Sequence, residues 1–383
     1  MSARGPVLCV VGARPNYMKM APLLRAIRAR LDLPPAVLIH TGQHYDFELN
    51  GSLFADLQLP VPDVNLEVGS GSHALQTAEV MKRFEPVIDQ FRPSCVVVAG
   101  DVNSTLACSL VASKKNAPVA HVEAGLRSFD RSMPEEINRV LTDQIADRLY
   151  TTERSAHANL VREGVSEDRM HFVGNLMIDS LLSALPKAVS AADLFRREGI
   201  QIEPSDRPMY AAITLHRPSN VDDVESLSNV VAILNEVAQR MPVIWPIHPR
   251  TRANIDKFGL DARLNGGRIF RLPPQGYFEM VGLMRDATLV LTDSGGIQEE
   301  TTALGIPCLT MRTNTERPIT VDQGTNTLVG SERSSVLAAV DDVVRTGGKR
   351  GRVPEYWDGQ AAQRIAQHMA LWLAGENGAS AKS

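Results

Sequence analysis

The stretch VLTDSGGIQEETTALGIPCLTM, residues 290–311, decides the fold of the second half of the chain. An apolar run ends at Thr292, the polar segment Asp-Ser-Gly-Gly follows, and a helical pattern begins directly after it. A buried strand that passes into a helix through a short glycine-containing loop is typical of a parallel α/β sheet. This order therefore predicts a strand, a loop at its carboxyl end and a helix that starts beside that loop.

Two interpretations of the loop remain open on this motif alone. Open parallel sheets bind ligands beyond the carboxyl ends of their strands, and a helix N-terminus attracts phosphate through its unpaired N–H groups. Glycines let an anion approach the backbone, so Ser294, Gly295 and Gly296 are phosphate candidates, and Glu300 is a candidate to bind a ribose diol. The alternative is that Asp293 or Ser294 merely caps the helix.

Short apolar runs alternate with amphipathic stretches along the whole chain. The predicted strands of the first half are residues 7–11, 36–41, 95–99, 119–122, 149–151 and 171–173; those of the second half are 210–215, 243–247, 268–272, 288–292, 308–311 and 327–328. This alternation indicates βαβ units. The predicted fold class is α/β, with two Rossmann-like, doubly wound parallel-sheet domains.

The pattern loosens between residues 182 and 208, which places the expected domain boundary there. We expect an N-terminal domain of residues 1–185 that carries the catalytic acids and a C-terminal domain of residues 186–358 that binds the nucleotide. A helix over residues 359–374 should pack back on the N-terminal domain, and the polar residues 375–383 should form a disordered tail.

Bulk composition limits the function classes. The 383 residues suffice for two cores, and 44% apolar and 22% charged residues fit an ordinary globular protein. A net charge of −4 offers no global attraction for nucleic acid, and no apolar run approaches the ~20 residues of a membrane span. The start of the chain lacks the features of a signal peptide. Four scattered cysteines indicate buried thiols in a reducing cytoplasm, and no Cys/His spacing suggests a metal site.

The segment VVGARPNYMKMAPL, residues 10–23, is the N-terminal counterpart of the glycine loop. It follows a strand but contains only Gly12, so it is not the fingerprint of a nicotinamide-binding loop. Arg14 and Lys19 flank the start of a helix, where cations oppose the helix dipole. An anion bound between them would explain their position; a solvated surface pair is the alternative.

Two successive strands of the first half end in acids. Asp101 follows one strand in CVVVAGDVNST, and Glu123 follows the next in PVAHVEAGLRS. Consecutive parallel strands are often neighbours, so both carboxylates should point into one crevice. Two close carboxylates push their pKa values apart, which suits one acid and one base. For Asp101, a helix N-cap is the alternative.

Further polar residues occur near predicted strand ends. Taken alone, Glu135, Glu136 and Arg139 in RSMPEEINRV fit an ordinary helix start. His216 in YAAITLHRPSN, His248 in WPIHPRTR and Arg317 in MRTNTERPIT follow strands of the second half, and Gln43 and His44 follow the second strand. The remaining histidines are expected to be structural: His40, His73, His121, His157, His171 and His368.

As an ordered set, these motifs resemble the non-hydrolysing UDP-N-acetylglucosamine 2-epimerases of bacteria. The resemblance covers residues 7–358 and rests on GARPNYMKMAPL, TGQHYD, GDVNSTLA, HVEAGLRSFDRSMPEEINR, VGNLMIDSL, HPRTR, DSGGIQEET and NTERPIT. It implies two Rossmann-like domains in a glycosyltransferase-B arrangement, a homodimer and no cofactor. It also implies interconversion of UDP-GlcNAc and UDP-ManNAc for surface-polysaccharide synthesis.

The resemblance also implies roles for individual residues. The diphosphate and sugar contacts fall on Arg14, Lys19, Ser294, Gly295, Gly296 and Arg317, and the ribose-binding acid falls on Glu300. The essential acids fall on Asp101, Glu123 and Glu135, the histidine on His216, and a further arginine on Arg139. Candidates for the activating second UDP-GlcNAc site of some members are Gln43, His44, Gln76, Glu136, Arg217 and His248.

The chain departs from the family pattern at three places. Asn16 stands where an acid is familiar, HRPSN replaces the commoner HRREN, and the loop between Glu123 and Glu135 is short. These differences bear on regulation and substrate specificity more than on the chemistry, since the charged set is complete.

A mechanism follows from the chemistry of the sugar. Carbon 2 has no adjacent carbonyl, so UDP must leave from C1 as C2 loses its proton, which gives a 2-acetamidoglucal. Asp101 and Glu123 are the predicted proton-handling pair. The alternatives are a hydrolysing epimerase, an epimerase of a 2,3-diacetamido uronic acid nucleotide, a glycosyltransferase of the same architecture and a catalytically silent UDP-sugar sensor.

Overall fold

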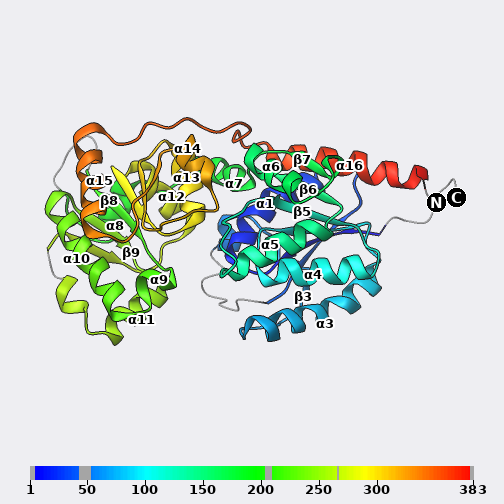
Figure 1. The fold of residues 1–383 in the computed structure, drawn as a ribbon, viewed down its shortest axis with the longest axis horizontal. Helices are drawn as coiled ribbons and strands as arrows, with labels where there is room; N and C mark the ends of the chain where they lie inside the picture. Colours follow the sequence, from blue (N-terminus) through cyan, green and yellow to red (C-terminus); the bar gives the residue numbers. More distant parts are fainter. Residues whose placement is uncertain (1–4, 43–52, 203–208, 265–266, 380–383) are drawn as a thin grey trace. The chain divides into compact units, whose positions relative to one another are not determined.

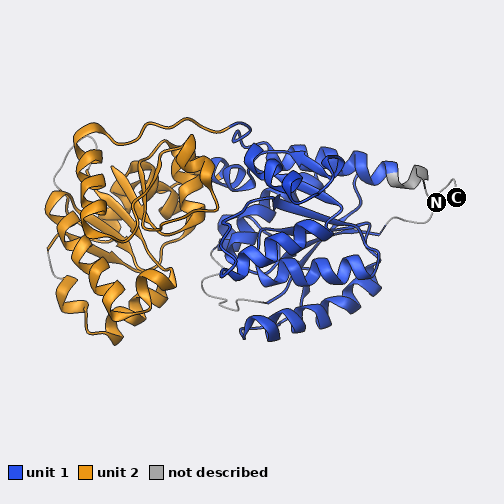
Figure 2. Cartoon of the chain, viewed as in Figure 1, with its two compact units in different colours: residues 1–183, 355–383 blue, residues 184–354 orange. Residues whose placement is uncertain are grey.

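The computed structural model describes residues 5–42, 53–202, 209–264 and 267–379. The chain divides into two compact units (Figure 2). Unit 1 comprises residues 1–183 and 355–383, and unit 2 comprises residues 184–354.

Unit 1 is built on a seven-stranded sheet in the order β3-β2-β1-β4-β5-β6-β7, and all neighbouring strands are parallel. The strands are β1 (Val7–Val11), β2 (Ala36–His40), β3 (Val64–Asn65), β4 (Cys95–Ala99), β5 (Val119–Ala124), β6 (Arg148–Thr151) and β7 (Met170–Phe172). The strand order reverses between β1 and β4, and such a reversal is where open sheets bind ligands.

Helices cover both faces of the unit 1 sheet (Figure 1). They are α1 (Arg14–Arg28), α3 (His73–Phe91), α4 (Asn103–Lys114), α5 (Pro134–Ile145), α6 (Arg154–Arg162), α7 (Leu176–Ala184) and α16 (Ala361–Ala379). Helices α3, α4 and α5 pack side by side, and α1 packs against α16. Asp179 of α7 accepts hydrogen bonds from the backbone N–H groups of Ala361 (3.1 Å) and Ala362 (2.8 Å), and it thereby caps α16.

Unit 2 repeats the architecture with a six-stranded parallel sheet in the order β10-β9-β8-β11-β12-β13. Its strands are β8 (Ala211–Thr214), β9 (Val243–Pro246), β10 (Ile269–Leu272), β11 (Leu289–Thr292), β12 (Cys308–Thr310) and β13 (Asn326–Leu328). Its helices are α8 (Ala191–Arg197), α9 (Pro218–Val221), α10 (Val224–Arg240), α11 (Pro249–Lys257), α12 (Tyr277–Asp286), α13 (Gly295–Leu304), α14 (Pro318–Asp322) and α15 (Arg333–Thr346). Here the strand order reverses between β8 and β11.

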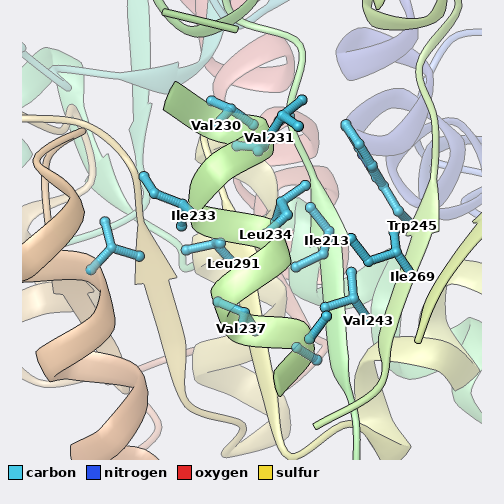
Figure 3. Close-up of a cluster of buried hydrophobic side chains, with 14 of the residues drawn as sticks. Ile213, Val230, Val231, Ile233, Leu234, Val237, Val243, Trp245, Ile269 and Leu291 are labelled. Carbon is cyan, nitrogen blue, oxygen red and sulfur yellow. The ribbon is translucent and has the colours of Figure 1, made fainter. Parts of the chain in front are cut away.

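The core of unit 2 shows why this pattern of residues folds as it does (Figure 3). Helix α10 places Val230, Ile233, Leu234 and Val237 on one face, at the spacing of a 3.6-residue repeat, and this face packs against the sheet. Trp245 of β9 is fully buried in the same cluster. Truncating a buried leucine such as Leu234 to alanine should cost about 2–5 kcal/mol of stability.

The predicted fold class is confirmed. Every predicted strand is present, with ends that differ by a residue or two. The prediction missed β3, because Val64–Asn65 is too short to produce an apolar run. The predicted bounds of the last helix, residues 359–374, differ from those of α16, which spans Ala361–Ala379. Residues 380–383 lie outside the described residues.

Two further findings concern the composition. The four cysteines are buried and unbridged, and burial raises the pKa of Cys308 to about 11 and of Cys9 to about 12. None of the helices in the described part of the chain has the length and apolar character that crossing a membrane requires.

Candidate active site

In unit 1, the loops after β1 and β4 are joined by Asn16. Its side-chain oxygen accepts hydrogen bonds from the backbone N–H groups of Gly12 (3.1 Å) and Ala13 (3.0 Å). Its side-chain nitrogen donates to the carbonyl of Ala99 (2.7 Å), the last residue of β4. An ionised aspartate could make the first two bonds but could not donate the third. The asparagine that departs from the family pattern thus connects the two central strands.

Glu123 forms a buried ion pair with Lys19: the Nζ atom lies 2.7 Å from Oε1. Glu123 has a positive φ of 68°, beside a register irregularity of β5 between Val122 and Ala124. A bulge of this kind redirects a side chain at a strand end. The expected diphosphate ligand Lys19 therefore bonds to a predicted catalytic acid.

Two features favour glycine at position 100, at the end of β4. Its φ is +69°, a backbone conformation that glycine adopts readily. A Cβ atom at this position would lie 2.9 Å from Nζ of Lys19 and 3.7 Å from Oε1 of Glu123. Gly100 precedes Asp101, so the segments that carry the two predicted proton-handling acids lie against each other at the same edge of the sheet.

Asp101 bonds to Arg139 of α5, whose NH2 atom lies 2.6 Å from Oδ2. The same guanidinium bonds to Glu136 (2.7 Å). Glu136 also accepts hydrogen bonds from the backbone N–H groups of Ser128 (2.9 Å) and Phe129 (2.9 Å). Glu136 lies in the first turn of α5, as an ordinary helix start would have it, but both Glu136 and Arg139 are buried and bond to other segments of the unit. The loop ahead of α5 covers them.

The predicted residue Gln76 belongs to a buried amide network beneath Asp101. The Asn103 side chain donates to Gln76 Oε1 (2.8 Å), and the Asn138 side chain donates to the Asp101 carbonyl (2.9 Å). The network orders the loop that carries Asp101. Glu135 is half-buried in the first turn of α5, and Arg14 is exposed at the start of α1. The predicted residues Gln43 and His44 lie outside the described residues.

In unit 2, Asp293 organises the loops at the strand reversal. It is completely buried and accepts hydrogen bonds from the backbone N–H groups of His216 (3.1 Å) and Arg217 (2.9 Å) and from the Asn220 side chain (3.0 Å). Burial by itself would raise the pKa of Asp293, but the interactions with His216, Asn220 and Arg217 outweigh it and lower the pKa. The sequence interpretation placed Asp293 in the loop but gave it no role in the site.

The ring of His216 contacts Asp293 as well. Its Nδ1 atom lies 3.2 Å from Oδ1 of Asp293, and the His216 side chain is 35% exposed. The ring centroid lies 5.3 Å from that of His248, whose Nδ1 accepts the backbone N–H of Arg250 (3.2 Å) and caps α11. Arg217 is half-buried at the N-cap of α9.

The N-terminus of α13 has no side-chain cap. Ser294 occupies the N-cap position without a capping hydrogen bond, and the Asp293 carboxylate points to the loop after β8 instead. The interpretation of these two residues as a plain helix cap is therefore wrong. A Cβ at Gly295 would lie 2.5 Å from Oε1 of Glu316, so a side chain there would displace the Glu316 carboxylate. Gly296 follows in the first turn.

The adjacent acids Glu299 and Glu300 have different partners. Glu299 Oε1 lies 2.9 Å from Nε of Arg317, and both side chains are buried. Glu300 Oε1 accepts a hydrogen bond from the Tyr277 hydroxyl (3.0 Å). Glu299 therefore orients the arginine expected to bind diphosphate, and Glu300 is the acid placed to accept further hydrogen bonds from hydroxyl groups.

The chemistry of the two units differs. Unit 1 gathers two carboxylates, each paired with a cation, which suits proton transfer. Unit 2 gathers an uncapped helix N-terminus, an imidazole and a guanidinium, which suits an anion. Among the residues that the structure describes, no group of three His, Cys, Asp or Glu side chains could hold a metal ion.

The chain is similar to known proteins over most of its length. The family model described as UDP-N-acetylglucosamine 2-epimerase matches residues 26–370. The UDP-N-acetylglucosamine 2-epimerase of Methanocaldococcus jannaschii is 40% identical over 362 residues, which is 94% of this chain and 97% of the relative. The UDP-2,3-diacetamido-2,3-dideoxy-D-glucuronate 2-epimerase of Pseudomonas aeruginosa is 39% identical over 368 residues, which is 95% of this chain and 99% of the relative.

A solved structure extends the likeness to the fold. The crystal structure of the Methanocaldococcus jannaschii UDP-GlcNAc 2-epimerase in complex with UDP-GlcNAc and UDP aligns with a TM-score of 0.86 at 38% identity. The alignment covers 96% of this chain and 99% of that one.

Proposed function

Because the chain belongs to the UDP-N-acetylglucosamine 2-epimerase family, we propose that it is a non-hydrolysing epimerase that interconverts UDP-GlcNAc and UDP-ManNAc. The observation that carries the proposal is the pair of cation-bound carboxylates, Glu123 on Lys19 and Asp101 on Arg139, at neighbouring strand ends. Binding of UDP-GlcNAc and UDP by the related Methanocaldococcus jannaschii enzyme supports the substrate.

The first half of the reaction is an elimination. One carboxylate takes the proton from C2, and the electron pair of the C2–H bond forms the C1=C2 double bond. The C1–O bond breaks, and its electron pair leaves with the diphosphate of UDP. The products held by the enzyme are 2-acetamidoglucal and UDP, and no oxidant or other co-reactant is needed.

The second half is the reverse addition from the other face. The second carboxylate delivers a proton to C2, and the diphosphate oxygen attacks C1 to restore the glycosidic bond. Proton-handling groups are therefore needed on both faces of C2, and Asp101 and Glu123 fill these roles. Glu135 supports one of them or binds the sugar.

The leaving diphosphate is stabilised mainly by unit 2. The first turn of α13 (Ser294, Gly295 and Gly296), together with Arg317 and His216, supplies donors and positive charge where negative charge grows, and Glu300 binds the ribose. Arg14 is proposed as a further diphosphate ligand, and each such charged hydrogen bond is worth about 1.5–3 kcal/mol. The activating second site remains part of the proposal, with His248 and Arg217 as its most accessible described members.

The deciding experiment is incubation of the purified protein with UDP-GlcNAc in deuterated water, followed by NMR. We expect UDP-ManNAc with deuterium at C2 and no accumulation of UDP. Epimer that retains hydrogen fully at C2 would contradict the elimination. Release of UDP with free ManNAc would identify a hydrolysing enzyme instead.

A second candidate substrate is UDP-2,3-diacetamido-2,3-dideoxy-D-glucuronate. The Pseudomonas aeruginosa relative that acts on it is as similar to this chain as the UDP-GlcNAc epimerase relative. The chemistry at C1 and C2 is the same, and the two sugars differ at C3 and C6. Measuring kcat/KM for both nucleotides under identical conditions decides between them.

The proposal further includes a homodimer, a cytoplasmic location and a role in surface-polysaccharide synthesis, as the family resemblance implies. Light scattering coupled to size-exclusion chromatography would measure the oligomeric state.

A further inference from the structure

His121 of β5, which the sequence interpretation left as structural, uses both of its ring nitrogens. Nδ1 lies 2.7 Å from Oδ1 of Asp143, and Nε2 lies 2.8 Å from the backbone carbonyl of Gly100. A carbonyl oxygen can only accept, so Nε2 carries a proton. The ring is completely buried, and so is Asp143.

Asp143 lies between the His121 ring and a guanidinium. Burial alone would raise the pKa of Asp143, but the interactions with His121 and Arg127 outweigh it and lower the pKa. His121 joins the Gly100 carbonyl on one side of its ring to the Asp143 side chain on the other.

Asp143 holds two further groups. Its Oδ2 accepts a hydrogen bond from the backbone N–H of Gly125 (3.0 Å) and lies 2.7 Å from NH2 of Arg127. Arg127 in turn donates to Glu163 through NH2 (2.6 Å). The Arg127 guanidinium therefore lies between two carboxylates, which offsets part of the cost of burying them.

The two ends of this arrangement reach the segments that carry the predicted catalytic acids. Gly100, held by His121, directly precedes Asp101. Gly125, held by Asp143, follows Glu123 by two residues. One buried side chain therefore connects to both acid-bearing loops, directly on one side and through the His121 ring on the other.

We propose that Asp143 and His121 are positioning residues that set the separation of Asp101 and Glu123 for proton transfer at C2. This inference rests on the proposed function, in which those two acids act on opposite faces of the sugar. A small error in their separation matters, because a displacement of about 1 Å in a catalytic group can cost 10²-fold in rate.

The composition of α5 argues against a purely structural role. Its buried residues are all polar, namely Glu136, Asn138, Arg139, Thr142 and Asp143, while Ile137 and Leu141 are exposed. A helix that served only to stabilise the unit would bury its apolar side, since well-packed apolar residues are commonly as stabilising as buried charges or more so. The polar face of α5 instead contacts the Asp101 loop, the Glu123 strand and His121.

The test compares Asp143→Asn and His121→Gln with Glu163→Gln as the matched control. Glu163 lies at the outer end of the same arrangement and is bonded to Arg127 rather than to either acid-bearing loop. Rates of C2 deuterium incorporation are measured at a temperature where all three variants are folded by circular dichroism. We expect kcat to fall about 10²-fold in the first two variants with KM little changed, and to fall less than about 3-fold in the control.

A second measurement does not depend on catalysis or on the folding of a variant. In the parent protein labelled with ¹⁵N-histidine, Nε2 of His121 should carry a proton that exchanges slowly with solvent, because the ring is buried and Nε2 donates to the Gly100 carbonyl.

The outcomes separate the two claims. Folded Asp143→Asn and His121→Gln proteins with parental kcat would overturn the positioning role, as would an Nε2 of His121 that carries no proton. A rate loss as large in Glu163→Gln would also overturn it, because it would indicate general destabilisation. A parent protein that forms no deuterated epimer contradicts the proposed function instead, and the Nε2 proton of His121 remains measurable in that case.

Discussion

Among the described residues, a histidine–aspartate pair lies near the carboxyl ends of the strands in each unit, and the two pairs differ in the burial of the ring. In unit 1, His121 and Asp143 are both completely buried, and both ring nitrogens bond to the protein. In unit 2, Asp293 is completely buried, but the His216 side chain is 35% exposed and only Nδ1 contacts the aspartate. Both histidines bond to an aspartate, so this bond does not distinguish their roles. The burial of the ring does: a buried ring can only position other groups, whereas a partly exposed ring can contact a ligand.

The two aspartates also share a task. Asp143 accepts the backbone N–H of Gly125, and Asp293 accepts the backbone N–H groups of His216 and Arg217. Each thereby anchors a loop that follows a strand at the reversal of its sheet or next to it. A buried carboxylate suits this purpose because it can accept several hydrogen bonds while a cation nearby keeps it ionised.

The largest loss of kcat is expected at Glu123 and Asp101, the two acids that His121 and Asp143 are proposed to position. Glu123→Gln cannot carry the proton, so kcat should fall about 10²–10⁴-fold. It also leaves the buried Lys19 ammonium without its anionic partner, which should cost about 3–5 kcal/mol of stability. Deuterium incorporation and urea unfolding measure the two effects.

Asp101→Asn serves as the companion to Glu123→Gln, because Asp101 is 20% exposed and its loss should destabilise the protein less. Its kcat should fall by a similar factor. Parental turnover in either folded variant would remove the proton-transfer roles.

The next effect tests the unit 2 pair. Asp293→Asn removes the negative charge against Nδ1 of His216 and weakens the acceptor of the backbone N–H groups of His216 and Arg217. We expect kcat to fall about 10–100-fold in the deuterium-incorporation assay, because the position of the ring is then less well defined.

Asn220→Ala is the matched control, since it removes one hydrogen bond to the same carboxylate without changing its charge. Its kcat should fall less than that of Asp293→Asn. An equal loss in both variants would mean that loop geometry, and not the charge of Asp293, governs the ring.

The lowered pKa of Asp293 predicts how its contribution to stability depends on pH. A carboxyl group with a lowered folded-state pKa contributes stability above its unfolded value of about 3.9 and loses it as pH falls through the folded value. The stability difference between the parent and Asp293→Asn should therefore be constant from pH 5 to 8 in urea unfolding. It should shrink only below about pH 4.

Asp179 is the opposite case to Asp293, because its pKa is raised and not lowered. It is a buried carboxyl group that accepts hydrogen bonds from the backbone N–H groups of Ala361 and Ala362. Burial raises the pKa of Asp179 to about 6. The native state then holds a proton that the unfolded state has released between about pH 4 and 6, so this group's contribution makes the protein less stable as pH rises through that range. Asp179→Asn should flatten this slope, which amounts to about 1–3 kcal/mol over the range. If Asp179→Asn leaves the slope unchanged, groups other than Asp179 cause this pH dependence.

The smallest effect is expected at Asn16. Asn16→Asp keeps the acceptor for Gly12 and Ala13 but removes one of two side-chain donors to the Ala99 carbonyl, which still accepts from the Thr105 hydroxyl (3.0 Å). The lost bond should cost about 0.5–1.5 kcal/mol in thermal or urea unfolding. Asn16→Ser, which also loses the long reach to Ala99, should be at least as destabilised. An Asn16→Asp protein as stable as the parent would show that the bond to Ala99 contributes nothing to stability.

Helix α5 marks the limit of prediction from the sequence. The apolar residues Ile137 and Leu141 recur at helical spacing, and such a pattern normally identifies the buried face. The structure buries the opposite, polar face instead. The signal that could have revealed this is the cluster of polar residues at Asn138, Arg139, Thr142 and Asp143, which share one side of a helix at this spacing.

The sequence by itself determined the alternation of strands and helices, the two-domain fold class, and the placement of nearly all polar candidates at carboxyl ends of strands. Those features depend on local periodicity and on glycine and proline positions, which neighbouring residues specify. Only the tertiary structure decided which acid pairs with which cation, that His121 is enclosed while His216 is partly exposed, and that Asp143 and Asp293 hold the loops. Such choices depend on contacts between residues far apart in the chain and on burial, which changes the cost of a charge by several kcal/mol.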